Sequence, residues 1–112
     1  METKEIIKNV VEKLNEKKAN NVKAYSLKHL DAIFDYFIIA STSNTTHVKS
    51  LSAEVEILLK KINKKISHIE TDLNFNWVLI DCDEIIINIF NEKTREFYNL
   101  ESLWADALEI SF

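Results

Sequence analysis

The chain has 112 residues, a length typical of one domain, and we expect residues 1–112 to form a single domain. Hydrophobic residues make up 46% of it and charged residues 29%, which favours a folded globular protein over a disordered one. The net charge of −4 argues against broad binding of nucleic acid, and we expect no direct sequence-specific binding. A small basic patch at residues 60–65, KKINKK, is left open as a local exception.

The cysteine count and the hydropathy pattern indicate where the protein resides. One cysteine, Cys82, excludes a disulfide within the chain. No apolar run approaches the about 20 residues of a membrane span, and the N-terminal METKEIIKNV alternates charged with apolar residues instead of forming a signal-peptide core. We therefore expect a cytoplasmic protein without membrane contact.

Neither glycine nor proline occurs in the sequence. Glycine and proline usually occupy turns and helix caps, so other residues must adopt the backbone angles of those positions here. We expect Asn and Asp to adopt many of the unusual backbone angles, because both tolerate the left-handed region.

In the N-terminal part, apolar residues at helical spacing predict a helix over residues 4–17 with Thr3 as its N-cap. A polar segment ends this helix, and strands are predicted at residues 22–28 and 35–41. The second strand, DYFIIAS, is almost entirely apolar, so we expect it to be buried on both faces at the centre of a sheet.

In the middle of the chain, the segment STSNTT at residues 41–46 offers hydroxyl and amide caps for a second helix. A helical stripe of apolar residues follows, at Val48, Leu51, Val55, Leu58, Leu59 and Ile62. A short strand at residues 65–69 is then predicted to return to the sheet by a crossover.

In the C-terminal part, residues 76–81 and 84–90 form two strongly apolar segments separated only by Cys82 and Asp83, which predicts a hairpin. Beyond Asn91 the spacing becomes helical, with Asn99 as cap and an apolar stripe at Leu100, Leu103, Trp104, Ala107 and Leu108. The predicted fold class is a small α/β (α+β) domain, with helices packed on a mixed sheet of about five strands.

Asp81 and Asp83, in the sequence DCD, are the first candidates for chemistry. Residues two apart on a strand share a face, so their carboxylates could hold a divalent metal between them. A metal-dependent nucleotidyltransferase is therefore the alternative function. The glycine-containing turn with which such enzymes approach a triphosphate is absent, because the chain has no glycine. We favour a polar hairpin turn, in which Asp adopts the required angles.

No other motif indicates catalysis. The three histidines lack the spacing of metal ligands, and Cys82 has no CxxC partner. The hydroxyl side chains of residues 41–46 lack the glycine-flanked turn of a nucleophilic serine, so we interpret them as a helix N-terminus, with binding of an anion there left open. We expect no metal, no cofactor and no enzymatic activity.

Aromatic residues gather in the C-terminal part of the chain, at Trp77, Phe90, Phe97, Tyr98 and Trp104. A domain this small needs some of them in its core, and we place Phe97 there and Trp104 there in part. Tyr, Trp and Arg are also enriched at protein interfaces. Four residues lie off the predicted helical stripe and are expected to be free to face a partner: Arg95, Glu96, Tyr98 and Glu101.

Four segments, in this order, resemble the ribosomal silencing factor family, RsfS, also called the Iojap family. They are DYFIIASTSNTTHVKSLSAEVE, NWVLIDCDEIIINIF, REFYNL and ESLWADA. The family patterns are DYFVI before a polar loop and a helix, WVLLDYGDVVVHVF, and REFYDLERLWGDA. The resemblance covers about residues 22–107, and its specificity lies in the series rather than in any single motif.

The chain departs from the family pattern at three places. Residues 82–84 replace YGD, so Asp83 must supply the turn angles of the lost glycine. Asn88 replaces a histidine, which weakens any case for acid–base or metal chemistry there, and Ala105 replaces a glycine. None of these changes removes a docking surface.

The resemblance implies a nucleotidyltransferase-like α/β fold that has lost catalysis and binds the large ribosomal subunit through ribosomal protein L-fourteen. Occupying the face where the small subunit docks would repress translation sterically, in starved or stationary cells. Homodimers of the free protein are also implied. From the matching segments we expect the ribosomal protein to contact Trp77, Asp81, Asn88, Arg95, Glu96, Tyr98, Glu101 and Trp104. Which tryptophan faces the partner is left open.

Overall fold

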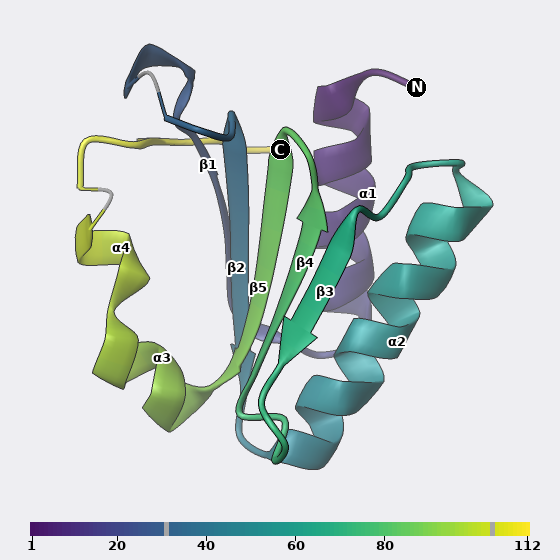
Figure 1. The fold of residues 1–112 in the computed structure, drawn as a ribbon, viewed down its shortest axis with the longest axis vertical. Helices are drawn as coiled ribbons and strands as arrows, with labels where there is room; N and C mark the ends of the chain where they lie inside the picture. Colours follow the sequence, from purple (N-terminus) through teal and green to yellow (C-terminus); the bar gives the residue numbers. More distant parts are fainter. Residues whose placement is uncertain (31, 104) are drawn as a thin grey trace.

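The computed structural model describes residues 1–30, 32–103 and 105–112. A central sheet lies between two layers of helices, with α1 and α2 on one face and α3 and α4 on the other (Figure 1). In the part of the chain described, no helix combines the length and apolar character that a membrane span requires. The elements are α1 (Thr3–Glu16), β1 (Asn20–Ser26), the 3-10 helix η1 (Lys28–Leu30), β2 (Tyr36–Thr42), α2 (Thr45–Lys61), β3 (His68–Thr71), β4 (Trp77–Cys82), β5 (Ile85–Asn91), α3 (Glu92–Tyr98), α4 (Leu100–Leu103) and β6 (Leu108–Glu109).

The strands of the described residues form one sheet in the order β3-β4-β5-β2-β1-β6. β2 and β5 are parallel and the other neighbouring pairs are antiparallel, so the predicted mixed sheet is confirmed with one strand more than expected. All residues of β2 are buried, and β2 lies inside the sheet as its apolar sequence predicts. The predicted hairpin is β4–β5, with Asp83 and Glu84 as its turn because Cys82 pairs with Ile85.

The larger core lies between the sheet and the helices α1 and α2. α1 buries four residues at helical spacing, Ile6, Ile7, Val10 and Leu14. The stripe predicted for α2 is buried at Val48, Leu51, Val55 and Leu59. Each such side chain contributes about 1.5–3 kcal/mol by leaving water, before conformational entropy is subtracted.

A smaller core lies on the opposite face of the sheet, beneath α3 and α4. Its buried residues are Leu27, Phe37, Ile39 and Phe90. Trp77 and Leu100 pack against this cluster but are only partly buried. Because α3 and α4 are short, they cover this face of the sheet less completely than α1 and α2 cover the other.

Three predicted boundaries are wrong. Glu2, rather than Thr3, is the N-cap of α1, because Glu2 has extended backbone angles whereas Thr3 is already helical. β1 begins at Asn20, where a bulge lets the chain join the sheet earlier than the apolar pattern indicates. β3 begins at His68 instead of residue 65, because the amide of Lys64 still bonds back to the end of α2.

The predicted C-terminal helix is wrong in its extent. Asn99 adopts left-handed angles, with φ 46° and ψ 52°, so the short helices α3 and α4 meet there at a sharp break. α4 ends at Leu103, and Leu108 lies instead in β6, which pairs with β1. Trp104, on the same predicted stripe, lies outside the described residues.

Six described residues adopt the positive φ angles that glycine usually adopts: Lys18, Asn21, Asn63, Phe75, Asp83 and Asn99. Four of the six are Asn or Asp, as predicted. Asp83, with a φ of 67°, supplies the turn of the β4–β5 hairpin, which confirms the role expected of it.

Candidate functional site

Helix α3 places two large side chains on the surface. Asn91 caps the helix, since its Oδ1 accepts the Thr94 amide at 2.9 Å, and Asn99 ends it two turns later. No residue of α3 is buried; Phe97 is 81% exposed and Tyr98 57%. The prediction that Phe97 belongs to the core is therefore wrong, because the helix capped by Asn91 turns this side chain outward.

An aromatic cluster joins α3 to the β4–β5 hairpin, and we call it the aromatic face: Trp77, Phe90, Phe97 and Tyr98. The Trp77 ring stacks on Phe90 at 6.0 Å between centroids and lies 6.4 Å from Tyr98. Tyr98 meets Phe97 edge-on at 5.2 Å. Ring pairs of this kind contribute about 0.5–1.5 kcal/mol beyond their buried area. Phe90 is buried beneath, so Trp77, Phe97 and Tyr98 form the accessible part.

A groove of about 430 Å³ runs beside the aromatic face, between α3 and the β3–β4 loop. Its lining residues are Asp72, Asn76, Trp77, Lys93, Thr94, Phe97 and Tyr98. Asp72 organises the loop, because Oδ1 accepts the amides of Asn76 at 2.7 Å and Trp77 at 3.2 Å. Burial raises the pKa of the Asp72 carboxyl, but the hydrogen bonds from Asn76 and Trp77 outweigh burial and leave the pKa below its usual value.

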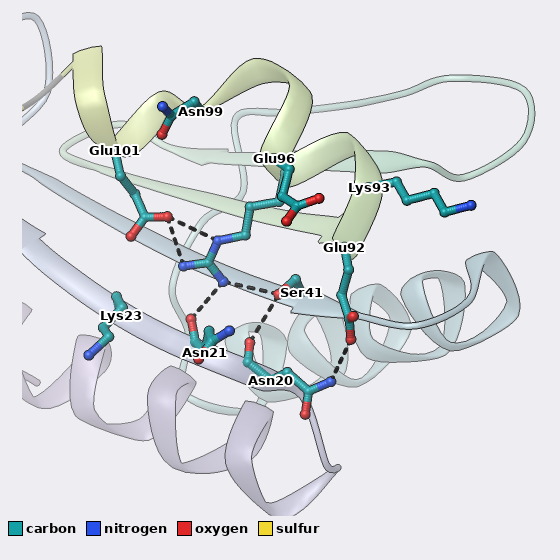
Figure 2. A pocket seen from close by; sticks show the side chains of 10 residues that line it. Asn20, Asn21, Lys23, Ser41, Glu92, Lys93, Glu96, Asn99 and Glu101 are labelled. Atoms are coloured by element: carbon teal, nitrogen blue, oxygen red, sulfur yellow. Dashed lines mark hydrogen bonds and ion pairs between the residues drawn. The ribbon is translucent and has the colours of Figure 1, made fainter.

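A second groove, of about 910 Å³, is polar and lies where α3 and α4 approach β1 and β2 (Figure 2). Its charged lining residues are Lys23, Glu92, Lys93, Arg95, Glu96 and Glu101. The Arg95 guanidinium pairs with Glu101, with Nη2 at 3.0 Å from Oε1, and only 11% of its side chain is exposed. The prediction that Arg95 is free to face a partner is therefore wrong.

The structure brings some of the predicted contact residues together and separates others. Trp77, Asn88 and Tyr98 are joined at the aromatic face, where the Trp77 indole bonds to Asn88. Glu96 is exposed and lines the polar groove with Glu101. Asp81 lies four residues along β4 from Trp77, about 13 Å away at the rise of a strand. Trp104 lies outside the described residues.

Asp72, Lys93 and Phe97 belong to the site but are absent from the predicted set. The signal for Phe97 was the cap at Asn91, which fixes the phase of a short helix and sets Phe97 beside Tyr98 on its outer side. Asp72 carries no comparable signal, because its role depends on a loop whose path is decided by contacts with Asn76 and Trp77.

The two aspartates of the DCD sequence make hydrogen bonds within the hairpin. Asp81 Oδ1 accepts the Asp83 amide at 2.9 Å, and Asp83 Oδ1 accepts the Ser67 hydroxyl at 2.6 Å. These bonds match the polar turn that we favour for this sequence. Within the described ranges, no three or more His, Cys, Asp or Glu residues are grouped so that they could hold a metal ion.

The other residues weighed for chemistry also have structural partners. His47 bridges the Thr42 side chain and the Lys17 carbonyl, and His29 bonds to the Asp106 carbonyl. Burial raises the pKa of the Cys82 thiol to about 11, which opposes formation of a reactive thiolate. Asn44, from the polar segment at residues 41–46, caps α2 by accepting the His47 amide.

Comparisons with known proteins find relatives of this chain in sequence and in fold. The sequence model of a family described as "Ribosomal silencing factor during starvation" matches residues 1–112. The ribosomal silencing factor RsfS of Halalkalibacterium halodurans is 30% identical over 107 residues, which cover 96% of this chain and 92% of that protein. A crystal structure of a protein from Chromobacterium violaceum superposes with a TM-score of 0.88 at 28% identity, covering 94% of this chain and 88% of the other. One from Bacillus halodurans gives 0.84 at 25% identity, covering 98% and 100%.

Proposed function

The chain belongs to the RsfS family of ribosomal silencing factors, and from this premise we propose that it binds the large ribosomal subunit through ribosomal protein L-fourteen and blocks joining of the small subunit. The observation that carries the proposal is the match of the family over the whole of residues 1–112. The result of binding is repression of translation in the cytoplasm of starved or stationary cells. The mechanism is steric and needs a docking surface rather than a catalytic group.

The aromatic face is the surface that fits this role. Trp77 and Tyr98 present aromatic area, and the Tyr98 O–H adds a polar group; Trp and Tyr are the residue types enriched among those that dominate binding energy at protein interfaces. Phe97 adds a large exposed ring to the same side of α3. Lys93 and Asp72 in the adjoining groove supply charges of both signs at the rim, where they favour one orientation of a partner.

The remaining predicted residues divide into two roles. Glu96 is exposed at the polar groove and is proposed as a rim contact, with Asp81 extending the contact along the hairpin. Asn88 is 3% exposed, so its role is to hold the Trp77 ring rather than to contact the partner. Glu101 and Arg95 lie in the polar groove and pair with each other. In the free protein, pairing of two aromatic faces is proposed to give the homodimer, because a self-complementary apolar patch favours two-fold association.

Co-sedimentation tests the proposal directly. Purified protein is mixed with isolated large subunits, and we expect it to pellet with them and not with small subunits. Adding small subunits afterwards should yield fewer joined ribosomes in a sucrose gradient than a sample without the protein. Isolated ribosomal protein L-fourteen should compete for the protein. Absence from the large-subunit pellet, or undiminished subunit joining, would reject the proposal.

A further inference from the structure

α3 has no buried apolar side chain, so hydrophobic packing of its own residues fixes its position only in part. Hydrophobic packing normally fixes where a surface helix sits. The two rings of α3, Phe97 and Tyr98, stay 81% and 57% exposed although Tyr98 lies against Trp77 and Phe90, and the helix is only seven residues long. Polar contacts on the inner side of α3 must therefore do much to hold the helix in position.

Arg95 supplies those contacts from the inner side of α3. Its Nη1 donates to the Asn21 carbonyl at 2.7 Å and to Ser41 Oγ at 3.0 Å, and its Nε donates to Glu101 Oε1 at 3.1 Å. One guanidinium thus joins α3 to β1, β2 and α4. The planar fork of donors makes this possible, and a lysine could not reproduce it.

The acceptors for Arg95 are prepared by irregular backbone and by buried groups. Asn21 has a φ of 49° and lies in the bulge of β1 between Asn20 and Lys23, where the ladder with β2 is interrupted. Its carbonyl is therefore available to a side chain. Ser41 is 1% exposed, and its hydroxyl donates to the Asn20 carbonyl while accepting from Arg95 (Figure 2).

Glu101 extends the same network further along β1, to Tyr25. Its Oε2 accepts the Tyr25 hydroxyl at 3.1 Å, and burial together with this hydrogen bond raises the pKa of Tyr25 to about 12. At the start of α3, Glu92 accepts a bond from the Asn20 side chain at 2.9 Å. Both short helices are thereby attached to β1 by polar groups.

The polar groove is accordingly poorly suited to an anionic ligand. Its three cations are balanced by three carboxylates, and the Arg95 charge is already paired with Glu101. The Arg95 guanidinium is ion-paired, largely buried and shared by four segments. Such a group serves to fix the positions of those segments relative to one another.

We infer that Arg95 is a positioning residue: with Glu101, Ser41 and the Asn21 carbonyl it holds α3 and α4 against the sheet, so that Tyr98 and Phe97 stay beside Trp77 in the orientation that docks. Arg95 acts through these residues and does not itself contact the partner. The inference rests on the proposed function for the identity of the partner, but the restraint on α3 is a property of the free protein.

Hydrogen exchange and ribosome binding of variants test the inference together. Arg95→Met removes the guanidinium, and Glu101→Gln weakens the ion pair from the α4 side with less risk to folding. Lys93→Met is the matched control, since it removes a cation from the same helix and groove.

We expect amides of residues 92–103 to exchange about tenfold faster or more in Arg95→Met and Glu101→Gln, with α1 and α2 unchanged. Both variants should also lose about tenfold in affinity for large subunits. Lys93→Met should leave the exchange unchanged, and Arg95→Lys should fall between Arg95→Met and the unaltered protein.

The outcomes separate this inference from the proposed function. Faster exchange in residues 92–103 supports the restraint even if the unaltered protein fails to bind ribosomes, a failure that would count only against the proposed function. Weaker binding with unchanged exchange would overturn the inference and make Arg95 a direct contact. Unchanged exchange and unchanged binding in Arg95→Met would overturn it as well.

Discussion

The indole Nε1 of Trp77 on β4 donates a hydrogen bond of 3.0 Å to Oδ1 of Asn88 on β5. Asn88 is 3% exposed and shares its strand face with Ile86 and Phe90, so the bond is shielded from water on its inner side. It fixes the rotation of the ring that lies against both Phe90 and Tyr98. The aromatic face thus depends on one buried amide at a position where the family pattern has histidine.

Replacing Asn88 with Leu should lower the free energy of unfolding by about 1 kcal/mol, because the side chain keeps its volume but loses the acceptor for Trp77. The emission of Trp77, followed in a Trp104→Phe background, should change as the ring loses its partner. Urea unfolding measures the first effect and fluorescence the second. Asn74→Leu, in the exposed β3–β4 loop, is the control and should leave both unchanged.

Truncating Tyr98 to Ala should weaken binding to large ribosomal subunits by about 1–2 kcal/mol, the range of an aromatic hot spot. Sedimentation at several subunit concentrations measures the loss. Ile57→Ala is the matched control, because Ile57 is 62% exposed on α2, in the helical layer on the opposite face of the sheet. Equal affinities for Tyr98→Ala and the unaltered protein, with the fold intact, would remove Tyr98 from the docking surface.

Introducing glycine at Lys18 should stabilise the protein by about 0.5–1 kcal/mol. Lys18 has a φ of 69° at the end of α1, where a side chain costs energy that glycine avoids. Thermal unfolding should show a higher Tm. Lys17→Gly is the control: Lys17 has a φ of −90°, so glycine there gains nothing and should lower the Tm. A lower Tm for Lys18→Gly would contradict the argument.

The thiol of Cys82 should react slowly in the folded protein. Burial raises its pKa from 9.0 to about 11, so the thiolate fraction at pH 8 is about a hundredfold lower than in the unfolded chain. A chromogenic disulfide reagent, with and without guanidinium, measures the difference. Reaction at equal rates in both conditions would refute the buried position.

The same pKa shift predicts a dependence of stability on pH. The unfolded chain releases the Cys82 proton near pH 9, before the folded protein does, so the stabilising contribution is complete below pH 9 and is lost as the pH rises towards 11. Cys82→Ala lacks this contribution to the pH dependence. The difference in Tm between the unaltered protein and Cys82→Ala should therefore change between pH 8 and pH 10.5. A difference that stays constant would contradict the raised pKa of Cys82.

Nucleotide with magnesium should leave the Tm unchanged. The carboxylates of Asp81 and Asp83 already accept hydrogen bonds in the hairpin, so binding of a metal would have to break them. Thermal unfolding at millimolar nucleotide and magnesium measures this, because a ligand that binds only the folded state raises the Tm. A rise that disappears in Asp81→Asn would revive the nucleotidyltransferase alternative.

The sequence by itself determined those parts of the protein whose signals are local. The stripe of α2, the apolar strand β2 and the paired segments of the β4–β5 hairpin can be predicted because helices and strands repeat within a short window. The left-handed role of Asp83 followed from the absence of glycine. Tyr98 is exposed, as expected, although the helical stripe from which this was inferred is interrupted at Asn99.

Only the tertiary structure decided the parts that depend on distant contacts. Arg95 is turned inward by acceptors 74 and 54 residues away in sequence, the Asn21 carbonyl and the Ser41 hydroxyl. β6 exists because β1 offers it a free edge, and no periodicity over two residues could reveal it. Long-range hydrogen bonds and strand edges leave no repeating pattern in the sequence. Only the fold therefore shows that Arg95 holds α3 in place while Phe97 and Tyr98 face solvent.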